Sequence, residues 1–539
     1  MGITTRLVAA TIALVLAAVP AMAQTSPVAD AAMRRDLPGV KALLAQKADV
    51  NQPQGDGSTA LHWAAYGGQP EMVRLLLAAG ADVTAATRLG GLTPLMMAAR
   101  AGDAEAVTLL LDAKAEAVTP NANGTTPMMF AAAAGSAAAV RLLAGRGADV
   151  NAADATNGQT PLMFAAAQGR VEAVRTLLAL KADPDRATKV SRIIPMGERY
   201  KQRTAGKGTR EITSEGGRSD ITAMGGLTAL LFAAREGHDG VVRALVEAGA
   251  DVNRVSGADE LSPLTMAIVN GRLDIAAYLL DHGANPNLAA TTGVGPLWAT
   301  IDARWPERTW YPPASITEET TTHVELLKAL LAAGADPNVR IVRKPWYRTF
   351  HGDWANPIGA TPFWLAAKAN DVEAMRLLAA VGANPTIPSA AGVSPLLVAA
   401  GFGIEPQVTN FKPNARLAAV RYLVEEAGLD VNVKDNQGYT PLHGAALTAD
   451  HELIQYLIAM GGDVTARASN VFGGENQADK DAGGGKGDTV ADMANGPRAH
   501  NMQFPETVAF LEALGSANSN NCRYAACVVP TLPSDTKKH

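Results

Sequence analysis

The apolar positions of this chain form a phrase that returns roughly every 33 residues. A Thr, Ser or Gly opens the phrase, an Ala-rich apolar stretch follows, and a second apolar stretch comes after a glycine. The opening residue falls at Thr59, Thr93, Thr126, Thr160, Thr228, Ser262, Gly295, Thr361, Ser394 and Thr440. A period near 33 residues is typical of stacked repeat arrays, which present binding surfaces.

The recurring Thr-Pro pair predicts where the first helix of each repeat begins. The Thr hydroxyl can accept a hydrogen bond from an unpaired backbone N–H, and Pro fits the first helical position, as at Thr93-Pro94. Glycines such as Gly102 and Gly80 follow the first and second helices, because a left-handed residue suits a helix C-terminus. Each repeat is therefore expected to be two short antiparallel helices and a turn.

The phrase after the second helix is also constant, reading Ala-Asp-Val-Asn at 148–151 and 250–253. Asp and Asn favour local turns, which fits a projecting hairpin between helix pairs. With these motifs the chain resembles the ankyrin-repeat family, whose unit reads roughly G-x-T-P-L-H-x-A-A, G-x-x-x-x-V-x-x-L-L and G-A-D-V-N. The resemblance covers roughly residues 37–465 and implies an all-α repeat solenoid of stacked helix-turn-helix units with projecting hairpin loops.

A single helix pair cannot bury both of its faces. A buried Leu or Val contributes about 1.5–3 kcal/mol, and each repeat offers only a few such residues. The entropy of ordering a whole repeat exceeds that gain, so stability is expected from stacking on neighbours.

The N-terminus carries a second pattern. Arg6 precedes an apolar run from Leu7 to Val19, and Ala21-Met22-Ala23 resembles a cleavage site. The run is too short to span a bilayer, so residues 1–23 are expected to be a removed secretory signal. The sequence therefore predicts a periplasmic or extracellular protein without membrane insertion.

The cysteines and the net charge limit which kinds of binding site the chain is expected to contain. Cys522 and Cys527 are the two cysteines of the chain and are expected to form one small disulfide in an oxidising compartment. The alternative is a metal or haem site, but the chain lacks Cys-x-x-Cys-His, and zinc needs more ligands than two thiols. We therefore predict no metal and no cofactor. A net charge of −5 offers no general attraction to nucleic acid.

Breaks in the period divide the chain further. We expect segments at 24–56 (capping repeat), 57–185 (repeats), 186–225 (basic insertion), 226–338 (repeats with an aromatic insertion at 303–322), 339–357 (aromatic and basic insertion), 358–465 (repeats, with a loop at 404–414), 466–487 (flexible Gly-rich loop), 488–515 (capping repeat) and 516–539 (tail). The basic insertion holds nine Lys and Arg against four acids. It is either a solvated arm, a clamp for an acidic partner, or a divergent repeat.

Six of the seven tryptophans fall between residues 298 and 364. Trp and Tyr interleaved with Arg and Lys dominate interface hot spots. The candidate partner-binding residues are Trp298, Trp305, Trp310, Tyr311, Arg343, Lys344, Trp346, Tyr347, Arg348, Trp354 and Trp364. The alternatives are a private mini-core and an aromatic shelf that binds a glycan or another small ligand.

The sequence contains no complete enzyme motif. His62 and His443 occupy the fourth place of the phrase, where the resemblance implies a structural hydrogen-bonding role. The next place, occupied by Trp63 and Phe130 among others, is expected to be a packing seam. The sequence therefore predicts a non-enzymatic scaffold for an unidentified protein partner, with carbohydrate or small-ligand binding as the alternative. It does not predict the oligomeric state.

Overall fold

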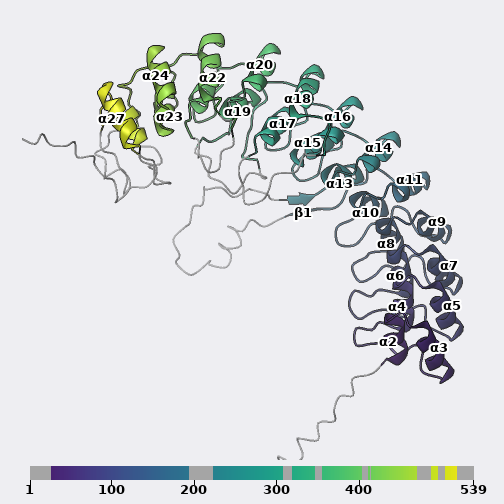
Figure 1. Ribbon diagram of the computed structural model, residues 1–539. Helices are drawn as coiled ribbons and strands as arrows, with labels where there is room; N and C mark the ends of the chain where they lie inside the picture. The colour runs from purple at the N-terminus through teal and green to yellow at the C-terminus, as the bar shows by residue number, and fades with distance from the viewer. Residues whose placement is uncertain are drawn as a thin grey trace, which may run out of the picture. The chain divides into compact units, whose positions relative to one another are not determined.

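The computed structural model describes residues 26–192, 223–306, 318–345, 355–403, 411–412, 414–469, 487–495 and 504–518. The chain divides into an N-terminal body, residues 1–189 and 225–251, and a C-terminal body, residues 190–224 and 252–539. Both bodies are stacks of helix pairs (Figure 1), and the predicted all-α repeat solenoid is confirmed. Within the described ranges the strands are β1 (Val190–Arg192) and β2 (Ala223–Gly225), which pair with each other.

The N-terminal body consists of inner helices, the first of each pair, and outer helices, the second. The inner helices are α2 (Pro27–Met33), α4 (Ala60–Tyr66), α6 (Pro94–Ala101), α8 (Pro127–Ala134), α10 (Pro161–Ala167) and α13 (Ala229–Glu236). The outer helices are α3 (Leu37–Ala45), α5 (Pro70–Ala78), α7 (Ala104–Asp112), α9 (Ala137–Gly145), α11 (Val171–Ala179) and α14 (Asp239–Glu247). Each inner helix contacts the next inner helix, and the hairpin loops project on the inner-helix side (Figure 1).

The C-terminal body repeats this arrangement. Its inner helices are α15 (Pro263–Val269), α17 (Pro296–Arg304), α19 (Pro362–Lys368), α21 (Pro395–Ala399), α23 (Pro441–Leu447) and α26 (Val490–Ala494). Its outer helices are α16 (Leu273–Asp281), α18 (His323–Ala332), α20 (Val372–Ala380), α22 (Arg416–Arg421) with the π-helical turn η2 (Tyr422–Glu426), α24 (His451–Ala459) and α27 (Pro505–Ala513). None of the described helices has the length and apolarity that crossing a bilayer requires.

Local chemistry sets the ends of the inner helices. The Thr93 hydroxyl accepts a hydrogen bond from the Met96 N–H at 3.3 Å, and Pro94 follows it. Gly102 ends the helix with φ 72°, a left-handed conformation that glycine adopts without strain. The paired alanines Ala98 and Ala99 are fully buried. Their small side chains allow neighbouring inner helices to approach closely.

In many repeats, an asparagine in the turn after the outer helix forms hydrogen bonds to the next repeat. The Asn287 Nδ2 donates to the Gly334 carbonyl at 2.9 Å, and its Oδ1 accepts from the Asp336 N–H at 2.7 Å. We call this pair of bonds the Asn bridge. The same bridge is made by Asn51, Asn151, Asn253, Asn338 and Asn432. The bridge thus links successive hairpins as well as shaping one turn.

Replacing Asn287 by Ala should destabilise the C-terminal body by about 1–2 kcal/mol, because two hydrogen bonds between repeats are lost. Urea unfolding followed by circular dichroism measures this change. Asn123→Ala is the matched control, since Asn123 is exposed at a hairpin tip and does not form the bridge. Equal stabilities of the two variants would contradict the role of the bridge.

Candidate binding surface

Trp298 and Trp364 are the third residues of the inner helices α17 and α19. Trp364 is fully buried, and its Nε1 donates to the Val393 carbonyl at 2.9 Å. Trp298 is 3% exposed, and its Nε1 has no hydrogen-bond partner. Such burial leaves a partner almost no surface on either ring, so in this structure both residues pack in the core instead of contributing to a binding site.

The contacts of His62 show why the third position of an inner helix is buried. Its Nδ1 accepts the Thr59 N–H at 3.1 Å, and its Nε2 lies 2.9 Å from the Leu92 carbonyl. Leu92 immediately precedes the helix cap of the next repeat, as Val393 does for Trp364. The third position of an inner helix therefore faces the neighbouring repeat, and Trp364 provides a link equivalent to that of His62.

The same position in α23 holds His443, which is completely buried. Its Nδ1 accepts the Thr440 N–H at 3.0 Å. Burial lowers the pKa of His443 to about 4 and also lowers the pKa of His62. A neutral, buried imidazole that caps its own helix is a structural group.

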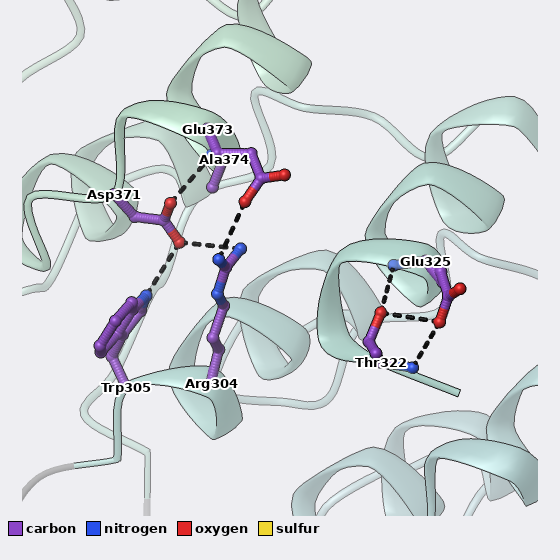
Figure 2. A network of polar contacts seen from close by, with 7 residues as sticks. All are labelled: Arg304, Trp305, Thr322, Glu325, Asp371, Glu373 and Ala374. Atoms are coloured by element: carbon purple, nitrogen blue, oxygen red, sulfur yellow. Dashed lines mark hydrogen bonds and ion pairs between the residues drawn. The ribbon is translucent and has the colours of Figure 1, made fainter. Parts of the chain in front are cut away.

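Arg304 and Trp305 fix the start of the aromatic insertion (Figure 2). The Trp305 Nε1 donates to Asp371 Oδ2 at 2.9 Å, and the Arg304 Nη1 lies 3.1 Å from the same oxygen as an ion pair without hydrogen-bond geometry. The Arg304 Nη2 bonds Glu373 at 3.0 Å. Asp371 is fully buried and caps α20 by accepting from the Ala374 N–H at 3.2 Å. The insertion thus starts from a point tied to the following repeat.

The other end of this insertion is tied to the preceding repeat. Asp274, at the start of α16, accepts hydrogen bonds from the Thr320 N–H, the Thr320 hydroxyl and the Thr321 N–H. Although burial acts to raise it, these donors lower the pKa of Asp274 to about 2. Thr322 and Glu325 then cap α18 reciprocally (Figure 2). Both described ends of the insertion are therefore anchored to outer helices.

Arg343 and Lys344 extend a projecting hairpin. The backbone N–H groups of Val342 and Arg343 donate to the Thr292 carbonyl at 2.8 and 3.1 Å. The side chains of Arg343 and Lys344 are exposed. Of the residues predicted to bind a partner, these two are accessible, and Trp305 is partly exposed.

The remaining predicted site residues lie outside the described ranges. They are Trp310, Tyr311, Trp346, Tyr347, Arg348 and Trp354, together with the predicted disulfide pair Cys522 and Cys527. Their roles, including the alternative of glycan binding, stay predictions. Across the part of the chain that the structure describes, no three His, Cys, Asp or Glu side chains are grouped as metal ligands.

The helix position that we expected to be a packing seam is partly exposed on the N-terminal body. The fourth residue of each inner helix from α4 to α13 is large and apolar, and together these residues form what we call the apolar row: Trp63, Met97, Phe130, Phe164 and Phe232. The first four are partly exposed, and Phe232 is 7% exposed. At the same position in the C-terminal body, Met266 and Val398 are buried, whereas Leu365 is partly exposed. The exposure of this position therefore belongs mainly to the N-terminal body.

Comparison with known families places repeats along both bodies. The family described as ankyrin repeats (3 copies) matches residues 28–121, 95–188 and 209–290. The family described as ankyrin repeat matches residues 358–390, and that described as ankyrin repeats (many copies) matches residues 413–458. Together these matches cover more than half of the chain.

Similar curated proteins differ widely in kind. Alpha-latrocrustotoxin-Lt1a of Latrodectus tredecimguttatus is 26% identical over 39% of this chain and 13% of its own length. The E3 ubiquitin-protein ligase KEG of Arabidopsis thaliana is 26% identical over 42% of this chain and 14% of its own length. Human ankyrin repeat domain-containing protein 49 is 47% identical over 10% of this chain and 21% of its own length.

This chain therefore spans only a small part of the length of these relatives. Among solved structures, the human ASB11 ankyrin repeat domain is similar, with 25% identity and a TM-score of 0.38. The match covers 49% of this chain and all of the ASB11 domain.

His443 should make stability depend on pH. Its pKa in the folded chain lies below the unfolded value of about 6.5, so the unfolded state binds a proton more readily. The contribution of the neutral His443 to the free energy of unfolding is fully present above pH 6.5. It falls by up to about 3 kcal/mol as the pH drops toward 4. Thermal unfolding at pH 7 and pH 4.5 measures this loss. His443→Gln, which can keep the helix cap, should reduce the loss, whereas His282→Gln at an exposed site should not.

Asp371→Ala should destabilise the chain by about 2–4 kcal/mol, because it leaves Arg304 with Glu373 as its remaining counter-charge, removes the acceptor of the Trp305 Nε1 and removes the cap of α20. Urea unfolding measures the effect. Lys41→Met, which breaks the exposed Lys41–Glu71 pair, should cost less than about 1 kcal/mol. A double-mutant cycle of Arg304→Met and Asp371→Asn should give a coupling of about 0.5–3 kcal/mol. Additive effects in this cycle would refute the anchoring role of the pair.

Proposed function

Because the chain belongs to the ankyrin-repeat family, we propose that it is an exported, non-enzymatic scaffold that holds a protein partner on its inner helices and hairpin tips. Ankyrin repeats are generally scaffolds for protein interactions, but this family membership does not identify a partner. The binding site has to be sought on a surface of this chain that is suited to contact a protein partner.

The apolar row carries the proposal. Soluble proteins seldom leave a continuous series of large apolar side chains partly exposed unless the surface is used for binding. Here Trp63, Met97, Phe130 and Phe164 come from inner helices that contact one another in sequence. The Trp63 Nε1 donates to Gln54 Oε1 at 2.7 Å, which holds the ring in one orientation before any partner arrives. Fixed aromatic side chains bind with a small loss of entropy.

A hairpin of the C-terminal body adds a second, polar surface to the proposal. Arg343 and Lys344 are exposed at a projecting hairpin of the C-terminal body. Cations of this kind improve the rate and the specificity of association more than the affinity. The absence of enzymatic activity belongs to the proposal, and it is supported by the structural roles of His62 and His443.

Export is supported by the sequence of residues 1–23, with their basic start, apolar run and small-residue cleavage site. Mass spectrometry of the chain recovered from the cell envelope or the medium should find Gln24 as the first residue. Recovery of the uncleaved chain in the cytoplasm would contradict this part of the proposal.

Partner capture tests the binding surface. The mature chain, crosslinked in an envelope extract, should retain a stoichiometric protein that mass spectrometry identifies. The double variant Phe130→Gln and Phe164→Gln should lose this protein, because the exposed apolar surface is removed. Val381→Gln is the control, since Val381 is exposed in the C-terminal body. Equal capture by all three proteins, with circular dichroism showing that each is folded, would move the site elsewhere.

A further inference from the structure

One hairpin tip of the N-terminal body carries a modification motif that the proposed function does not use. The residues Asn123-Gly124-Thr125 lie between α7 and α8 and match Asn-x-Ser/Thr, the acceptor motif for N-linked glycans. The same spacing occurs once more, at Asn384-Pro385-Thr386, but a proline in the middle position does not satisfy the motif. Asn123 is therefore the one asparagine in the sequence that the motif selects.

The turn itself explains only part of this motif. The Asn121 Oδ1 accepts the N–H groups of Asn123 and Thr125 at 3.0 and 2.8 Å, and so shapes the turn. Gly124 has φ 80°, and a Cβ on it would lie 2.4 Å from the Ala155 nitrogen, so this position requires glycine. The side chains of Asn123 and Thr125 take no part in these contacts.

Both of these side chains are accessible. Asn123 is exposed and Thr125 is partly exposed. Among the described residues, neither the Asn123 amide nor the Thr125 hydroxyl forms a hydrogen bond. An enzyme that modifies the tip can therefore reach the amide without first breaking a bond that the amide makes.

The tip is also held less firmly by the following hairpin than another tip of this body is. The Asn157 carbonyl accepts the backbone N–H of Lys189 at 2.8 Å. The Asn123 carbonyl accepts only the Thr156 hydroxyl, at 3.4 Å, which is long for a hydrogen bond. A transferase can thus draw this tip toward itself with little disturbance of the stacked repeats.

From the motif, the exposed amide and the weakly held tip, we propose that Asn123 carries an N-linked glycan on the exported chain. The donor is an oligosaccharide linked through phosphate to a membrane lipid. The Asn123 Nδ2 attacks the anomeric carbon and forms the N-glycosidic bond. The bond from that carbon to the phosphate oxygen breaks, and the lipid phosphate and the proton from Nδ2 leave. The inference rests on the export in the proposed function.

The glycan lies on the side of the array where the partner is proposed to bind. The hairpin of Asn123 leads into α8, which contributes Phe130 to the apolar row, and the hairpin loops project on the inner-helix side (Figure 1). A glycan is bulky and strongly hydrated. It therefore opposes self-association through the exposed row.

Mass spectrometry of the chain recovered from the cell that produces it tests the proposal. Trypsin should release residues 115–141 as one peptide, which contains Asn123. This peptide should show the added mass of an oligosaccharide, and fragmentation should place that mass on Asn123. Asn157 is the control within the same sample. It is exposed at another hairpin tip and is also followed by glycine, but Gln159 stands where the motif needs a hydroxyl, so it should stay unmodified.

Variants test whether the motif directs the modification. Asn123→Gln and Thr125→Ala should each abolish the added mass, whereas Thr125→Ser should retain it. Circular dichroism confirms that each variant is folded. Added mass on Asn123 that survives Thr125→Ala, or added mass on Thr125 instead, overturns the proposal.

The N-terminus of the recovered chain separates this proposal from export. An unmodified 115–141 peptide from a chain that begins at Gln24 refutes the glycan and leaves export standing. A chain that keeps residues 1–23 and carries no glycan refutes both.

Discussion

The contact between neighbouring repeats is the constraint on which the rest of this structure depends. The helices are short: α4 has seven residues and α5 has nine. Isolated helices of this length are not stable in water, so each pair persists only because its neighbours cover it. The Asn bridge adds polar bonds to the apolar stacking, and it joins the hairpins as well as the helices. This stacking leaves the outward side of the inner helices and the hairpin tips accessible, together with the exposed face of the outer helices.

This constraint separates two adjacent positions of the inner helix. The third residue faces the next repeat, and it is buried whether it is His62, Met96 or Trp364. The fourth residue is turned away from that contact and is partly exposed at Trp63 and Phe130. Successive helix residues are rotated by about 100°, so a shift of one position exchanges a core environment for a surface. Residue type alone therefore does not reveal which aromatic side chains a partner can reach.

The helix starts could be predicted from sequence, because a Thr-Pro cap acts on residues within one turn. The burial of Trp364 was not predicted, since the density of tryptophans favoured binding, although His62 at the same position indicated a structural role. The Asn bridge was also missed, because Asn indicates a local turn, whereas both partners of the Asn287 side chain, the Gly334 carbonyl and the Asp336 N–H, belong to the next repeat. The pairing of Arg304 with Asp371 joins residues that are distant in sequence, and no local signal marks it.

The anchored ends of the aromatic insertion bear on how such a protein diversifies. Trp305 is held on Asp371 and Thr320 is held on Asp274, so the described residues on either side of the interval 307–317 are fixed by side-chain bonds. Asp371 caps the outer helix of the repeat that follows the insertion, and Asp274 lies at the start of the outer helix of the repeat that precedes it. A substitution at either aspartate therefore alters where the insertion begins or ends, so the insertion and the two neighbouring repeats are expected to change together during divergence.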